Sequence, residues 1–172
     1  MSGQRFEPFH WAGRFARSLR PSAPSPGDRA WAGEWMSPAE AALFDAMDDR
    51  DRSHSIGVAR KVASVSEDPA MLAAALLHDV GKSRARLGLV GRVVATLVGV
   101  VARDAWLARF AGGMGLAGRV ATYLDYPALG RTLLTEAGSD PLVAAWAAEH
   151  HWPPAEWSVP AAVGHVLADA DR

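Results

Sequence analysis

One stretch of this chain has to lie inside the folded protein. From Met71 to Leu77 the sequence reads MLAAALL, without a single polar side chain. The preceding Asp68-Pro69 is typical of a helix start, since proline fits the first helical position. A helix that is apolar on every side belongs in the middle of a core. We expect it to end at Gly81, in the left-handed conformation that glycine adopts readily.

Helical signals continue along the rest of the chain. Residues 37–40 read Ser-Pro-Ala-Glu, a capping box that predicts a helix reaching about Met47. No alternating run of β-branched residues is long enough to indicate a strand. Further helices are expected to begin near Asp49–Asp51, Pro127, Pro141 and Pro160, with two or three more apolar helices within residues 88–124. The sequence therefore predicts an all-α fold of about seven or eight helices.

Residues 1–36 differ in composition from the remainder. Aromatic and arginine side chains alternate there, and the stretch PSAPSPGD at 21–28 is expected to form no regular element. We interpret residues 1–36 as an N-terminal arm and residues 37–172 as the domain. The arm either docks its aromatic side chains onto the domain or contacts a partner or a membrane surface.

Composition excludes several classes of protein. Lys and Arg number 18 against 19 Asp and Glu, so the chain lacks the basic excess of a general binder of nucleic-acid polymers. The absence of cysteine excludes disulfide frameworks, cysteine zinc sites and thiol catalysis. The most apolar run, 93–102, is too short to cross a bilayer, and we see no secretory signal. We expect a cytoplasmic protein, and the sequence is compatible with a homo-oligomer.

The apolar helix leads directly into His78-Asp79. A buried charge is costly unless it is paired or bound to a metal, and imidazole and carboxylate both bind divalent cations. The alternative is that Asp79 caps the helix end or pairs with an arginine while His78 is an ordinary core histidine.

Two further helices contribute polar groups near the core. Val58 and Val62 follow His54 at helical spacing, which puts His54 on the inward face. On the last helix Asp171 flanks the apolar stripe, whereas Asp169 points further away. Each group alone suits a half-buried histidine or a solvated acid. Together with His78-Asp79 they form a set of two imidazoles and two carboxylates.

The segments HSIGVARKV, AALLHDVGK, EHH and LADAD, in this order, resemble the HD phosphohydrolase superfamily over residues 37–172. The resemblance implies an all-α helical bundle that binds one divalent metal ion (Mn, Fe, Co, Ni, Zn or Mg). It also implies which residues bind that metal: His54, His78, Asp79 and Asp171, with Asp169 as the alternative for the last.

The implied activity is hydrolysis of a small phosphate ester, such as a nucleotide, by a metal-activated water. Asp79 would both bind the metal and orient the water. Lys82 would place positive charge near the phosphate, the alternative being a solvated lysine. Arg84, in the same basic loop, would line an anion site or remain solvated.

His150 and His151 need a separate interpretation. Adjacent side chains on a helix point about 100° apart, so one of the two can face the core squarely. Family members with two metals carry an additional histidine where this chain has Tyr126, and their Gly-Tyr-Pro signature is missing here. We therefore expect one metal, with His150 and His151 contacting the substrate or completing the metal shell. The alternatives are a degenerate HD domain that binds a nucleotide or protein partner without turnover, and a purely structural helical module.

Overall fold

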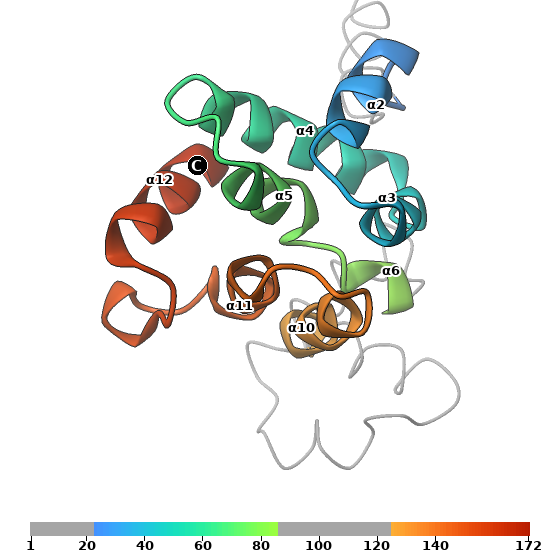
Figure 1. Cartoon of the computed structure of the whole chain (residues 1–172). Helices are drawn as coiled ribbons and strands as arrows, with labels where there is room; N and C mark the ends of the chain where they lie inside the picture. Colours follow the sequence, from blue (N-terminus) through green and yellow to red (C-terminus); the bar gives the residue numbers. More distant parts are fainter. Residues whose placement is uncertain (1–22, 86–124) are drawn as a thin grey trace, which may run out of the picture.

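The computed structural model describes residues 23–85 and 125–172. All regular secondary structure in these residues is helical, so the predicted all-α fold is confirmed (Figure 1). The elements are α2 (Pro26–Gly33), α3 (Pro38–Asp45), α4 (Asp49–Ala63), α5 (Pro69–Leu77), α6 (Lys82–Ala85), α10 (Tyr126–Glu136), α11 (Pro141–Glu149), the 3-10 helix η1 (Pro154–Glu156) and α12 (Ala161–Asp171).

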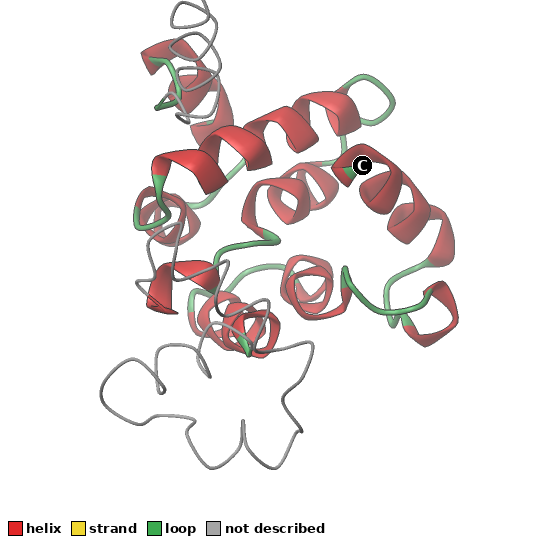
Figure 2. Ribbon diagram, turned by 180° about the vertical axis from the view of Figure 1, so that it is seen from behind, coloured by secondary structure: helices red, strands yellow, loops and turns green. Residues whose placement is uncertain are grey.

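Helix α5 forms the centre of the molecule, as its sequence predicts. It contacts α3, α4, α11 and α12, which surround it in both views (Figures 1 and 2). All residues from Met71 to Leu77 are buried. The Asp68 carboxylate starts the helix by accepting hydrogen bonds from the backbone N–H groups of Ala70 (2.8 Å) and Met71 (3.2 Å). Because α5 is covered on all sides, the residue that ends it, His78, lies deep inside the protein.

The predicted capping box at the start of α3 is present. The Ser37 hydroxyl accepts from the backbone N–H of Glu40 at 3.3 Å, and the Glu40 carboxylate accepts from the backbone N–H of Ser37 at 2.8 Å. Helix α4 begins similarly, with Asp48 accepting from the backbone N–H of Asp51 at 3.0 Å. Such local bonds satisfy N–H groups that the helix itself leaves unpaired, which is why these starts can be predicted from sequence.

The predicted end of the central helix is wrong. Helix α5 stops at Leu77, with His78 as a right-handed cap at φ −56°. Among the glycines of the described residues, Gly138 is the one with a positive φ, of 73°, so Gly81 is not left-handed. A Cβ atom on Gly81 would lie 1.9 Å from the carbonyl oxygen of Tyr126. Glycine is needed at this position because α10 approaches the turn closely.

The expectation that PSAPSPGD forms no regular element is wrong for its last three residues. Pro26 opens α2, and the Ser25 hydroxyl caps it by accepting from the backbone N–H of Asp28 at 3.1 Å. Arg60 of α4 binds the Asp28 carboxylate at 3.1 Å and lies 4.0 Å over the ring of Trp31. The second half of the predicted arm thus packs on the domain, and the boundary at residue 37 stays a prediction.

Several predicted features lie outside the described residues. They are the first 22 residues of the arm and the helices expected between 88 and 124. None of the helices in the described ranges has the length and apolar character needed to cross a membrane.

Candidate metal centre

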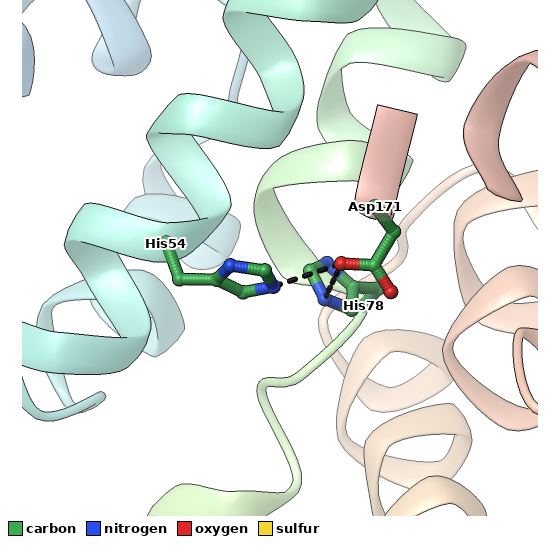
Figure 3. A group of neighbouring side chains, drawn as sticks. All are labelled: His54, His78 and Asp171. Atoms are coloured by element: carbon green, nitrogen blue, oxygen red, sulfur yellow. Dashed lines mark ion pairs between the residues drawn. The ribbon is translucent and has the colours of Figure 1, made fainter. Parts of the chain in front are cut away.

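Three predicted ligands from three helices meet at one point (Figure 3). His54 comes from α4, His78 follows α5, and Asp171 ends α12. Their ligand atoms all lie within 4.8 Å of one another. Asp171 Oδ1 is 2.8 Å from His54 Nε2 and 3.7 Å from His78 Nε2. The three side chains therefore surround a single small volume, as the ligands of one cation must.

The packing of α4 and α12 against the central helix brings these residues together. Helix α12 contacts both α4 and α5. The Lys61 ammonium of α4 donates to the carbonyl of Ala170 at 2.8 Å, next to Asp171 in the chain. This bond ties the last turn of α12 to the helix that carries His54.

His78 is oriented by its own helix. Its Nδ1 lies 2.9 Å from the carbonyl oxygen of Ala75, and a carbonyl only accepts hydrogen bonds. Nδ1 therefore carries the hydrogen, and in the neutral ring the lone pair is on Nε2. That nitrogen faces carboxylate oxygens of Asp79 at 3.5 Å and Asp171 at 3.7 Å. Lone pairs directed at one another in this way are the arrangement that a shared cation stabilises.

Asp79 lies next to the three-residue cluster and is almost fully buried. Its Oδ2 binds the Lys82 ammonium at 2.5 Å, and its Oδ1 accepts no hydrogen bond from the described residues. Burial alone would raise the pKa of Asp79, but His78, together with the charge and the hydrogen bond of Lys82, outweighs it and lowers the pKa to about 2. An ionised, buried carboxylate with an open oxygen is costly without a further partner. The donor set therefore fits a divalent cation.

The pKa shifts of His54 and Asp171 favour the charged form of each residue. The hydrogen bond to Asp171 raises the pKa of His54 above its ordinary value, although burial opposes the shift. Burial raises the pKa of Asp171, but the hydrogen bond from His54 and the nearby His78 hold it below its ordinary value. Negative charge is thus stabilised at the point where the imidazoles converge.

Geometry distinguishes the two candidate acids at the end of α12. Asp169 is exposed and binds the guanidinium of Arg172 at 2.9 Å. Asp171 faces His54 and His78 instead. The structure brings Asp171, and not Asp169, to the cluster.

Lys82 and Arg84 follow in α6. The Lys82 ammonium is occupied by Asp79 and lies 4.8 Å over the ring of Tyr126, so it sits at the cluster and not on an open surface. The side chain of Arg84 lies outside the described part of the chain.

His150 and His151 lie on the side of the cluster where Asp79 is. His150 is buried, with Nε2 3.8 Å from Asp79 Oδ1 and its ring centroid 5.2 Å from that of His78. Burial, with help from the neighbouring His78 and His151, lowers the pKa of His150 to about 3. His151 is more exposed, and its ring centroid is 3.9 Å from that of His150.

Two residues that contact or adjoin His150 and His151 were not assigned a role from the sequence. The Tyr126 hydroxyl reaches both imidazoles, although the sequence marked this position only as a missing histidine. Glu149, just before the histidine pair, is buried and binds Arg131 at 2.6 Å and both the backbone N–H and hydroxyl of Ser158. The position of Glu149 directly before two histidines was the sequence signal that could have marked it. Its bonds to Arg131 and Ser158 hold the end of α11 in place.

A model of the HD domain family matches residues 51–97, the segment that contains His54, His78 and Asp79. The comparisons with curated proteins and with solved structures found no match. The matched segment contains nearly all of α4, the whole of α5 and the turn between α5 and α6, which together carry most of the cluster. Residues 51–97 of this all-α chain are thus similar to the HD domain family.

Proposed function

We propose that this protein hydrolyses a small phosphate ester, such as a nucleotide, with one divalent metal ion. The observation that carries the proposal is the convergence of His54, His78 and Asp171 from three helices beside the buried Asp79. An inert core gains nothing from the buried His78 and Asp79, because both must be desolvated, whereas His54 and Asp171 are partly exposed beside them. Members of the HD family are generally metal-dependent phosphohydrolases, which agrees with this set of donors.

The proposed metal ligands are His54, His78, Asp79 and Asp171. A mixture of imidazole and carboxylate suits Mn, Fe, Co, Ni or Zn, and Mg remains compatible with the carboxylates. Bound there, such an ion would polarise a phosphoryl oxygen and lower the pKa of water.

The chain's own groups have defined tasks in this proposal. The open Oδ1 of Asp79 is an acceptor that can orient the attacking water. The Lys82 ammonium, 2.5 Å from Oδ2 of the same carboxylate, places positive charge where a phosphate would approach. His150 and His151 line the opposite side of Asp79 and contact the substrate.

The test combines elemental analysis of the purified full-length chain with a panel of nucleotide and non-nucleotide phosphate esters, assayed with each metal. We expect about one metal per chain and metal-dependent release of phosphate or of a phosphorylated product. Metal binding without turnover of any ester would favour the alternative, a domain that binds a nucleotide or a protein partner. Failure to bind metal would contradict the proposal.

A further inference from the structure

The hydroxyl of Tyr126 lies between two histidine side chains. It is 3.3 Å from Nε2 of His150 and 2.5 Å from Nε2 of His151. The tyrosine is buried at the start of α10, where its carbonyl packs against Gly81 and the Lys82 ammonium lies over its ring. The hydroxyl is therefore held at this position from several sides.

The protons in this group can be assigned from the fixed acceptors of α11. Nδ1 of His150 lies 3.2 Å from the carbonyl oxygens of both Trp146 and Ala147. Carbonyls only accept, so Nδ1 carries the hydrogen and the lone pair of the neutral ring is on Nε2.

A lone pair on His150 Nε2 sets the direction of the next two bonds. Tyr126 donates its single O–H to His150, because that nitrogen has no hydrogen to give. The phenol oxygen is then left as an acceptor toward His151. The short contact at His151 Nε2 is satisfied when that nitrogen carries the hydrogen.

We propose that Tyr126 is a positioning residue that couples the tautomers of His150 and His151. The carbonyl groups of α11 fix the hydrogen of His150, and the Tyr126 hydroxyl, bonded to His150, then fixes the hydrogen of His151. The result is opposite tautomers in the adjacent pair: His150 protonated at Nδ1, and His151 protonated at Nε2. With no hydrogen on His150 Nε2, Oδ1 of Asp79, 3.8 Å away, stays available to orient water. That last consequence rests on the proposed function, whereas the assignment of the hydrogens does not.

The test is ¹⁵N NMR of the full-length chain with labelled histidine, at neutral pH and after removal of divalent metals by a chelator. In the unsubstituted protein we expect His150 to show a protonated Nδ1 and an unprotonated Nε2, and His151 to show the reverse. Tyr126→Phe removes the hydroxyl and keeps the ring. It should leave His150 unchanged and cost His151 its preference, so that its two ¹⁵N resonances move toward each other.

His165 of α12, whose ring centroid is 5.4 Å from that of Trp157, is the internal control and should not change. Protonation of His150 at Nε2 in the unsubstituted protein would overturn the proposal, as would an unchanged His151 in a folded Tyr126→Phe protein. If that variant does not fold, the unsubstituted spectrum still decides. Expected tautomers in a protein that binds no metal would contradict the proposed function alone.

Discussion

At the residue scale, the centre depends on which carboxylate each imidazole faces. His54 and His78 both point their Nε2 atoms at one oxygen of Asp171, while Asp79 is shared between His78 and Lys82. The contacts of Asp171 join different helices, and Lys82 is joined to Asp79 across the turn after α5.

Asp171→Asn should weaken metal binding by more than about 100-fold, because even partners one step removed from a metal are typically worth 10–100-fold. The matched control is Asp169→Asn, two residues away on the same helix, exposed and bound to Arg172. Calorimetric titration with the metal measures both. Equal affinities in the two variants would contradict the choice of Asp171.

Lys82→Ala should keep the metal and lower the rate of phosphate-ester hydrolysis roughly 100-fold, the usual cost of removing one donor to a developing oxyanion. An ammonium group cannot bind a cation, so the metal content should not fall. Arg172→Ala, at an exposed ion pair, is the control for loss of a positive charge. Full activity of the Lys82→Ala protein would contradict a role in catalysis and would leave Lys82 only its structural ion pair with Asp79.

The buried His150 predicts a pH dependence of stability. Its pKa is 6.5 in the ordinary case and about 3 in the folded protein, so between these values the unfolded chain binds a proton that the folded chain does not. The free energy of unfolding should therefore fall as the pH decreases below 6.5, by on the order of 1 kcal/mol per pH unit. Urea unfolding of the chelated protein at several pH values measures this slope. His150→Gln should have a shallower slope, and an identical slope would refute the assignment.

At the element scale, the turn after α5 and the start of α10 are locked by close backbone contact. A Cβ on Gly81 would meet the Tyr126 carbonyl at 1.9 Å and the Gly130 nitrogen at 2.8 Å. These atoms belong to backbone and cannot rotate away. The contact sets α10 against the turn that carries Asp79 and Lys82.

Gly81→Ala should lower the free energy of unfolding by roughly 3 kcal/mol, the upper end for overpacking a filled site. Gly57→Ala is the matched control, since a Cβ at that helical position meets nothing within 4 Å. It should raise stability by about 1 kcal/mol, because alanine is the better helix former. Thermal or urea unfolding measures both, and the prediction fails if the two substitutions have the same sign.

At the scale of the whole molecule, the N-terminal region divides into a part that packs on the domain and a part outside the described residues. Helix α2 buries Ala32 in the core and is joined to α4 through Arg60. No proposed ligand precedes residue 37. The metal site is therefore expected to be independent of residues 1–22.

A chain that lacks residues 1–22 should keep its metal content and activity. Removal of residues 1–36 also takes away α2. This should lower the melting temperature by several degrees, because the core surface that Ala32 and Trp31 cover becomes exposed. Elemental analysis and thermal unfolding of both truncated chains measure this. Loss of metal from the shorter truncation, while it remains folded, would show that its first residues complete the site.

Local rules were sufficient for what lies close in sequence. The apolar run before His78 predicted the central helix, and the Ser37–Glu40 capping box predicted the start of α3, because both depend on neighbours a few residues away. His54 and the His78-Asp79 pair were also visible, since a polar group on an apolar helical face is a local departure from the pattern. The role of glycine at position 81 was misjudged, because its reason is a contact with residue 126 and not its own dihedral angles.

Tertiary structure alone decided the contacts between distant segments. It brought Asp171, which the helical stripe already favoured over Asp169, to 2.8 Å from His54, because that contact depends on how α12 packs on α4 and α5. It also paired Lys82 with Asp79 and placed the Tyr126 hydroxyl between His150 and His151. Hydrogen bonds act over about 3 Å, whereas spacing along the chain says nothing about which atoms of distant helices come that close.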